Sequence, residues 1–421
     1  MSMTKKEFRR STIMYLIASL FLIYEMGIQV SPSVMTHDLM RDFHVDAASL
    51  GVMVSFYFYS YALMQIPAGI LYDHFGPRTL LTVASVLCSL GTLFFAGTET
   101  VYWAAFGRFL MGIGSAFAFV GVLVVAARWF DGYYFAFLVG LAQLLAVLGA
   151  ICGAAPLAKG VDLIGWHNMM YLLAALGGML AVLAIFILED RPKHLHHDVL
   201  KPEKHLWLHL KQIVCQGQTW ALAIYAFSSW GPVIVFAALW GVPYLMVRYG
   251  ITNVTASFAT MLMLLGGGLF SPVIGYLSNR MQRRKPLLWI GSFLGCLTSF
   301  IMLYIPGIPF WGVAALLFLM GVGTSVHTLT FAIVQDNNKP SVAATGMGFN
   351  NMAVVIGGAV LQPLVGYILT RLWDGSYAGG VPVYTISNYE NALLIMPIIY
   401  IIGLIFSLAF IKETYCKSNN S

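Results

Sequence analysis

Two ionisable residues lie inside long apolar stretches of the sequence, Glu25 within residues 12–35 and Arg108 within residues 101–127. A helix rises about 1.5 Å per residue, so both fall at a similar depth, roughly 20 Å from one face of a hydrocarbon core about 30 Å thick. A full charge in lipid is costly without a partner. The spacing therefore allows a Glu25–Arg108 ion pair or a ligand shared between the two, although a purely structural pair between two helices is the alternative.

This pair of charges suggests a chemistry for each member. An amino acid or short peptide can place its ammonium group near Glu25 and its carboxylate near Arg108. Glu25 is also the expected proton carrier, because an Arg that approaches and withdraws changes how readily a buried carboxyl holds a proton. We expect proton-coupled uptake of a small zwitterionic nutrient. The alternatives are transport of another small organic solute (nucleoside, siderophore or organic anion) and a nutrient sensor that does not transport.

Other polar and aromatic residues in apolar stretches are candidates for the lining of a binding site. Tyr57 and Tyr61 are four residues apart and share one helix face, which could line a cavity or pack against another helix. His327 can titrate, although a lone helical histidine is as often a hydrogen-bonded packing residue. The further candidates for substrate binding or proton coupling are Tyr24, Gln29, Gln143, Trp230, Asn350 and Asn351.

The sequence offers little support for an enzyme or a metalloprotein. It has no nucleotide-binding loop, no nucleophile–base pair and no ligand spacing typical of a metal site. We therefore expect no catalytic residues, no cofactor and no bound metal. The net charge of +6 gathers in loops on one side and does not indicate nucleic acid as a partner. The expected partners are a small-molecule substrate, protons and the lipid bilayer, with the protein a monomer.

The elements that must position these residues are membrane-spanning helices. The 421 residues are 59% hydrophobic and 10% charged, whereas soluble proteins carry about 25% charged residues. Twelve apolar stretches are long enough to cross a bilayer: 12–35, 48–71, 79–97, 101–127, 135–158, 167–188, 219–243, 254–278, 286–305, 310–333, 344–369 and 391–411. We expect an all-α membrane protein, with residues 1–188 and 219–421 as two six-helix bundles and residues 189–218 as a cytosolic linker.

Basic residues indicate which way the helices cross. With these boundaries, 18 of the 23 Lys and Arg residues lie in the termini and the even-numbered loops, and 4 lie in the odd-numbered loops. Cytosolic loops are enriched in Lys and Arg. We therefore expect both termini and the linker in the cytosol. The short outward loops favour a bacterial inner (cell) membrane.

A pattern of glycines and charges occurs once in each half of the chain. GILYDHFGPRTLL at residues 69–81 returns as GYLSNRMQRRKPLL at residues 275–288, and FLMGIGSA at residues 109–116 returns as FLMGVGTS at residues 318–325. The offsets are 206 and 209 residues, so the two copies lie at nearly one spacing. Such internal repetition is typical of transporters built from two related halves.

The first copy resembles the signature loop of the major facilitator superfamily, G-x-L-x-D-x-x-G-x-R. The matching residues are Gly69, Leu71, Asp73, Gly76 and Arg78. The Arg and spaced glycines at residues 108–114 are similar to the signature of the family's fourth helix. Residues 31–35 and 56–78 look most like the phagosomal nutrient transporters of intracellular bacteria, and lysosomal dipeptide carriers share part of the pattern. The resemblance implies two pseudo-symmetric six-helix bundles and secondary active transport by alternating access.

The resemblance also implies a gate at the cytosolic face. In the family, the Asp of this loop faces the positive end of a helix in the other half, which here places Asp73 opposite residues 344–345. Glycines in the loop allow close approach and sharp turns of the helix ends. Asn279 replaces the Asp in the second copy, which weakens the matching contact. The gating candidates are Gly69, Asp73, Gly76, Arg78, Arg128, Gly275, Arg280 and Arg284, although these charges could instead only mark the membrane boundary.

Overall fold

The computed structural model describes residues 5–130, 132–190, 206–338 and 340–416, and the side chains within them except at 5–6, 73–74, 132–137, 206–209 and 340–344. Twelve helices in this part of the chain are long and apolar enough to cross a membrane, as the sequence predicts. The expected all-α fold is confirmed, with one short β-hairpin in addition.

The first half of the chain contains six of these spans. Its elements are α1 (Lys5–Val30), the 3-10 turn η1 (Ser31–Val34), α2 (Thr36–Asp42), α3 (Ala47–Gly97), α4 (Val101–Ser115), α5 (Ala118–Trp129), α6 (Gly132–Cys152), α7 (Ala155–Ile164) and α8 (Trp166–Ile187). α3 contains two spans, joined at a kink at Gly76. α4 and α5 together make the fourth span, which carries Arg108.

The second half repeats this arrangement with more breaks inside its helices. Its elements are α9 (Leu206–Val214), α10 (Gly217–Val235), the π-helical turn η2 (Phe236–Trp240), α11 (Gly241–Tyr249), α12 (Asn253–Met281), α13 (Lys285–Tyr304), α14 (Phe310–Thr324), the 3-10 turn η3 (Ser325–His327), α15 (Thr328–Asn337), α16 (Pro340–Leu372), β1 (Tyr377–Ala378), β2 (Val381–Pro382), α17 (Ile386–Leu393), α18 (Ile395–Ile405) and the π-helical turn η4 (Phe406–Phe410). β1 and β2 pair antiparallel.

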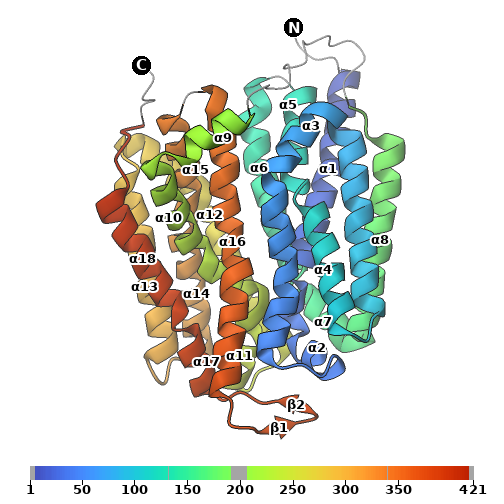
Figure 1. The fold of residues 1–421 in the computed structure, drawn as a ribbon, viewed down its shortest axis with the longest axis vertical. Coiled ribbons are helices and arrows are strands. Elements are labelled where there is room, and N and C mark those ends of the chain that lie inside the picture. The colour runs from blue at the N-terminus through green and yellow to red at the C-terminus, as the bar shows by residue number, and fades with distance from the viewer. Residues whose placement is uncertain (1–4, 131, 191–205, 339, 417–421) are drawn as a thin grey trace.

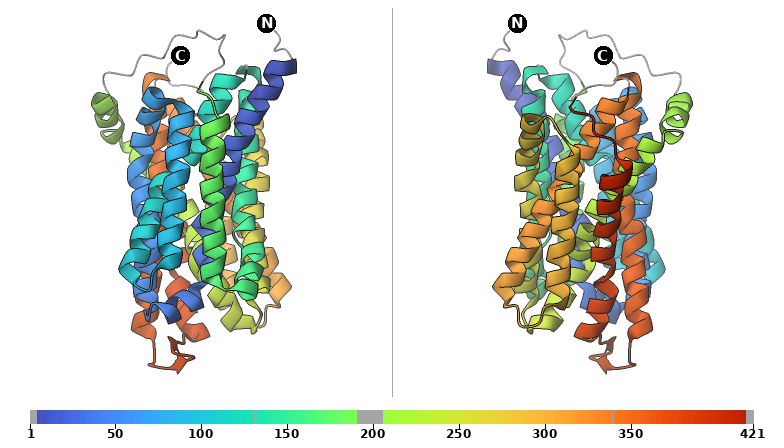
Figure 2. Two further views of the ribbon diagram at one scale, coloured as in Figure 1. Left: turned by 90° about the vertical axis from the view of Figure 1, so that its right-hand side faces the viewer. Right: turned by 90° about the vertical axis from the view of Figure 1, so that its left-hand side faces the viewer.

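The two halves stand side by side, and both chain termini lie at the same end (Figure 1). We call this the termini end, and we call the opposite end, which carries β1 and β2, the hairpin end. α9 lies at the edge of the termini end (Figure 2). It packs there through the buried side chain of Ile213 against Ala223 of α10 and Phe349 of α16. Part of the expected linker is therefore a helix that packs against the second half.

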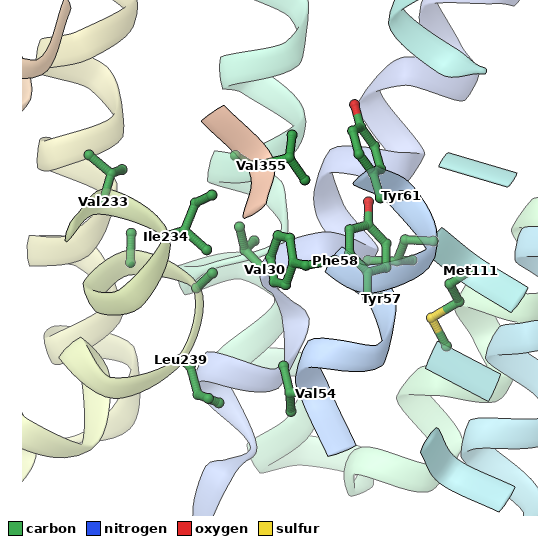
Figure 3. Close-up of a cluster of buried hydrophobic side chains, with 14 of the residues drawn as sticks. Val30, Val54, Tyr57, Phe58, Tyr61, Met111, Val233, Ile234, Leu239 and Val355 are labelled. Atoms are coloured by element: carbon green, nitrogen blue, oxygen red, sulfur yellow. The ribbon is translucent and has the colours of Figure 1, made fainter. Parts of the chain in front are cut away.

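The halves meet across an apolar layer. Val233, Ile234 and Leu239 from α10 and η2 belong to one buried cluster with Val30 and Phe58 of the first half (Figure 3). Burial of such side chains excludes water from the contact. Close backbone packing adds to it, since a Cβ atom at Gly358 of α16 would lie 2.6 Å from the ring of Phe58.

Hydrogen bonds join the halves mainly toward the hairpin end. The amide of Asn253 donates to the carbonyl of Val34 at 2.6 Å. The backbone N–H groups of Ala47 and Ala48 donate to the hydroxyls of Tyr384 and Thr370, at 3.0 and 3.1 Å. In this conformation the two halves are therefore held together at the hairpin end.

Candidate functional site

Glu25 is fully buried on α1 and is bound by a tyrosine of α3. The hydroxyl of Tyr57 donates to Oε1 of Glu25 at 2.6 Å. Oε2 is buried and has no hydrogen-bond partner among the described residues. A buried carboxyl oxygen without a partner is costly, so this atom is a candidate to hold a proton or to meet a ligand.

Arg108 is fully buried on α4 and reaches the end of α1. Its NH1 group donates to the carbonyl of Ile28 at 3.0 Å, and NH2 is 3.5 Å from the carbonyl of Gln29. Pro32 has no N–H with which to bond the Ile28 carbonyl four residues earlier, and that carbonyl accepts from the Ser31 hydroxyl at 2.9 Å as well as from Arg108. Carbonyls in the last turn of a helix also attract a cation.

Tyr57 joins the two charges and keeps them from pairing directly. The guanidinium carbon of Arg108 lies 4.6 Å from the centre of the Tyr57 ring, and the hydroxyl of the same ring binds Glu25. The ion pairs among the described residues do not include Glu25 with Arg108. The direct pair that the depths allow is therefore not formed in this conformation, where an aromatic side chain from a third helix contacts both residues. A ligand shared by both remains a prediction.

The polar face of α3 continues past Tyr57 toward the termini end. Tyr61 stacks on Tyr57 with ring centres 5.9 Å apart, and both side chains point the same way in Figure 3. Gln65, one turn further along, accepts a hydrogen bond of 2.7 Å from the amide of Asn351 on α16. The packing use of this face is seen at Gln65, which contacts α16 of the other half, while its use as a cavity lining stays a prediction.

A second polar cluster lies within the second half, at the break between α14 and α15. The rings of Trp230 and His327 are 4.5 Å apart, and Nδ1 of His327 lies 3.0 Å from the carbonyl of Thr324. The amide of Asn350 donates to the hydroxyl of Thr330 at 2.8 Å. In the described residues no hydrogen bond links this cluster to Glu25 or Arg108, and His327 has the contacts of a packing residue.

Among the described residues, three other predicted site residues form no hydrogen bond with the Glu25 carboxyl. The hydroxyl of Tyr24 lies 3.4 Å from that of Thr92, and its ring packs against Gly177 of α8, so Tyr24 fills the interior of the first half. Gln29 contributes its backbone carbonyl to Arg108. Gln143 is half-buried on α6 and forms no hydrogen bond with the described part of the chain.

The signature loop of the first half is tied to its own half. Gly76 has φ 73° and ψ 166°, a conformation nearly restricted to glycine. The carboxylate of Asp190 lies over it and accepts a 2.9 Å hydrogen bond from the N–H of Arg78. The Arg78 side chain donates to the carbonyl of Ile185 at 2.8 Å, and Arg128 donates to that of Tyr72 at 2.8 Å. These bonds anchor the loop to α5 and α8.

The second copy is anchored in the same way. Oε1 of Glu413 accepts from the N–H of Arg284 at 3.0 Å, and the side chain of Lys285 donates to the carbonyl of Leu408 at 2.8 Å. Glu413 and Leu408 each lie 223 residues after their counterparts in the first half, Asp190 and Ile185. In each half, a carboxylate that follows the sixth span of that half therefore accepts a hydrogen bond from a backbone N–H at the start of its third span.

Sequence reasoning missed the two capping carboxylates. A signal was present, because an acidic residue follows the sixth span in LEDRPK at residues 188–193 and in IKETY at residues 411–415. The side chain of Arg284 also forms an ion pair with Asp336 at 2.7 Å, which sequence reasoning did not predict.

The remaining gating candidates have few contacts. Among the described residues, a Cβ atom at Gly69 or Gly275 would meet no other heavy atom within 4 Å. The close approach expected at Gly69 is therefore wrong, and Gly275 has equally open surroundings. Arg280 is exposed. The side chain of Asp73 lies outside the described residues, and its contact with residues 344–345 stays a prediction.

Comparison with known proteins assigns nearly the whole chain to one family. It matches the model of the Major Facilitator Superfamily over residues 17–361 and 235–420. It is 22% identical to a probable galactarate/D-glucarate transporter of Escherichia coli, over 89% of this chain and 90% of that protein. It is 24% identical to a chloroplastic ascorbate transporter of Arabidopsis thaliana (90% and 74% covered), and 22% identical to a lysosomal dipeptide transporter of Pongo abelii (89% and 82%).

A solved structure shows the same fold. The chain superposes on a bacterial homologue of the human lysosomal transporter Spinster, in an inward-facing and occupied conformation, with a TM-score of 0.78 and 14% identity, covering 97% of each chain. The chain belongs to the Major Facilitator Superfamily and is an integral membrane protein and secondary transporter of that type.

Proposed function

We propose that this transporter carries a small organic anion together with a proton, and that Arg108 receives a carboxylate of the substrate. The observation that carries this proposal is the set of partners around Arg108. The guanidinium is fully buried, yet its contacts are two backbone carbonyls, the Met111 sulfur at 3.7 Å and the Tyr57 ring. Its Nε atom has no hydrogen-bond partner in the part of the chain that the structure describes. A buried cation without a counter-ion favours an anionic ligand.

An organic anion replaces the zwitterionic nutrient as the preferred substrate. Relatives of this chain are named as transporters of galactarate and D-glucarate, of ascorbate, of sulfoacetate and of tartrate. These are small acids without an ammonium group. The ammonium site that a zwitterion needs is also less open than expected, because Tyr57 occupies one oxygen of Glu25.

A dipeptide is the second candidate. One relative is named as a lysosomal dipeptide transporter. The carboxylate of a dipeptide would bind Arg108, as that of an organic acid would. Its ammonium group would then need Oε2 of Glu25, the oxygen to which no described residue donates a hydrogen bond.

We assign the coupling proton to Glu25. Arg108 and Glu25 both contact Tyr57, so one positive charge lies close to one ionisable carboxyl. Binding a substrate anion beside an ionised Glu25 would put two negative charges against one guanidinium, and a proton on Glu25 removes that excess. Proton and anion therefore favour each other's binding, and by linkage the effect is reciprocal.

We place the termini end in the cytosol, in the cell membrane of a bacterium, with the protein working as a monomer. The excess of Lys and Arg in the loops of that end supports this orientation. With it, the hydrogen bonds at the hairpin end close the outer face. A cavity of about 310 Å³ lies over that closed face, between the segment around His37 and the segment around Asn253.

A binding experiment tests the substrate class. The purified protein is heated with glucarate, ascorbate or tartrate, with dipeptides, and with single amino acids, at pH 5.5 and pH 7.5. A ligand that binds the folded state raises its stability, by about 2.7 kcal/mol at a concentration of 100 Kd. We expect stabilisation by an organic acid, stronger at pH 5.5, and its loss in Arg108→Gln. Stabilisation by dipeptides alone would favour the second candidate.

A transport experiment tests the proton assignment. In proteoliposomes, Glu25→Gln should abolish accumulation driven by a pH gradient and should retain exchange of labelled for unlabelled substrate. The matched control is Glu99→Gln, an exposed carboxyl between α3 and α4. Accumulation at the wild-type level in Glu25→Gln would exclude Glu25 as the proton carrier.

A further inference from the structure

An apolar groove is lined by residues of α3, α4 and α16. These helices are neighbours in the fold (Figure 1). The volume of the groove is about 970 Å³, and its walls include Val52, Phe106, Leu364 and Tyr367. These four side chains are exposed, and Tyr102, which also lines the groove, is 85% exposed. The groove lies toward the hairpin end, because its α3 and α4 walls come from the first turns of those helices and its α16 wall from the last turns.

The walls come from both halves of the transporter. α3 and α4 belong to the first half and α16 to the second. Directly beside the groove, the N–H of Ala48 donates to Thr370, and the hydroxyl of Ser55 donates to the carbonyl of Gly358 at 3.1 Å. The groove therefore lies over the seam that must open when the hairpin end opens.

A cation lies one turn beyond the apolar wall, at the end of a span. Arg371 is exposed, its Nε donates to the hydroxyl of Tyr367 at 2.9 Å, and its guanidinium lies 5.1 Å from the Tyr367 ring. The span of α16 ends at Leu372, which places Arg371 at the level of the lipid headgroups. Arginine binds phosphate groups well at such a position.

The carboxylates closest in sequence to this end of the groove are engaged elsewhere. Asp374 accepts hydrogen bonds from the N–H and hydroxyl of Ser376, at 3.0 and 2.6 Å. Asp46 accepts from the N–H of Ser49 at 2.8 Å. Within the described ranges, Arg371 forms no ion pair and remains available to an anion.

We propose that this groove binds one anionic phospholipid, with an acyl chain against Val52, Phe106 and Leu364 and the phosphate on Arg371. An acyl chain covers apolar surface that has no protein partner, and the guanidinium adds a preference for negative headgroups. The lipid contacts both halves while the hairpin end is closed. It therefore stabilises this conformation over one in which α3 and α16 have separated.

The test is native mass spectrometry of the full-length protein with added phosphatidylglycerol or phosphatidylcholine. We expect one phosphatidylglycerol to be retained, at least fivefold more tightly than phosphatidylcholine. Arg371→Gln should remove this preference. Val52→Trp, which fills the groove from an exposed position, should prevent retention of either lipid at this site.

Two control variants separate this site from general lipid binding. Val83→Trp changes an exposed position of α3 outside the groove, and Lys159→Gln removes an exposed cation of α7. Both should bind phosphatidylglycerol like the wild type. Equal retention in Val52→Trp and wild type, or equal affinity for the two lipids, would overturn the proposal. Neither outcome depends on the transported substrate or on Glu25.

Discussion

The Tyr57 hydroxyl donates a 2.6 Å hydrogen bond to Glu25, while the ring of the same side chain lies 4.6 Å from the guanidinium carbon of Arg108. One neutral residue on α3 thus contacts the buried acid of α1 and the buried base of α4. Movement of α3 changes the surroundings of both charges at once. Such a link is suited to coupling a proton to an anion, since each charge is affected by the state of the other.

Removal of the Tyr57 hydroxyl tests this link. Tyr57→Phe keeps the ring near Arg108 and leaves Oε1 of Glu25 without its donor, which should cost about 1–3 kcal/mol. If Glu25 carries the proton, accumulation driven by a pH gradient should fall about tenfold, and its dependence on pH should shift. Tyr59→Phe, at a more exposed position of α3, is the control. An unchanged pH profile of uptake in Tyr57→Phe would argue against the link.

The two glycines of the first signature loop should differ sharply. Gly76→Ala places a Cβ atom 2.4 Å from the carboxylate of Asp190 and forces a conformation that alanine rarely adopts, so we expect a loss of about 1–3 kcal/mol. Gly69→Ala meets open space and should change stability by less than about 0.5 kcal/mol. Thermal unfolding in detergent measures both variants. Equal effects would show that the contact between Asp190 and Gly76 is unimportant.

The ion pair between Arg284 and Asp336 should contribute to the stability of the second half. Both side chains are about 11% exposed, and the hydroxyl of Thr414 also donates to Asp336 at 2.7 Å. Arg284→Gln leaves a largely buried carboxylate without its cation and should cost about 3 kcal/mol.

The same measurement separates the pair from a general charge effect. Arg283→Gln removes an exposed neighbouring cation and should have little effect. The double variant Arg284→Gln with Asp336→Asn should recover part of the loss, because no buried charge then remains unpaired. Full additivity of the two substitutions in thermal unfolding would contradict the pairing.

Asp42, outside the spanning helices, should make the hairpin end sensitive to acid. Burial raises the pKa of Asp42, but the Arg41 guanidinium and the Trp166 indole N–H, at 2.7 Å, outweigh it and hold that pKa below its usual value. Ionised Asp42 therefore contributes stability above its unfolded pKa of about 3.9, and the contribution is lost as pH falls through the lower folded pKa.

The variant Asp42→Asn should be less stable than wild type near neutral pH and should lose less stability between about pH 5 and pH 2. Asp162→Asn, at an exposed carboxyl of α7, is the control. Thermal unfolding across this pH range measures the effect. If Asp42→Asn and wild type lost equal stability as the pH falls, Asp42 would contribute nothing to the acid sensitivity.

Hydropathy and repetition were sufficient for the architecture. A bilayer requires that backbone groups bond within the segment that crosses it, so twenty apolar residues indicate a helix without knowledge of any neighbour. The boundaries were less well predicted. The fifth span ends at Ile164 rather than near residue 158, and the seventh ends at Tyr249 rather than near residue 243. The added turns of both spans are largely apolar but contain charges, Lys159 and Asp162 in the fifth and Arg248 in the seventh.

The sequence by itself determined the twelve spans, the duplication and the depth of Glu25 and Arg108, because each of these depends on distance along a helix. The tertiary structure decided the contacts, which depend on how each helix is rotated and what it faces. Depth alone allowed Glu25 to pair with Arg108, but the packing of α3 joins both to Tyr57. Likewise, Asp190 caps the helix at Arg78 only because the fold brings together segments 112 residues apart.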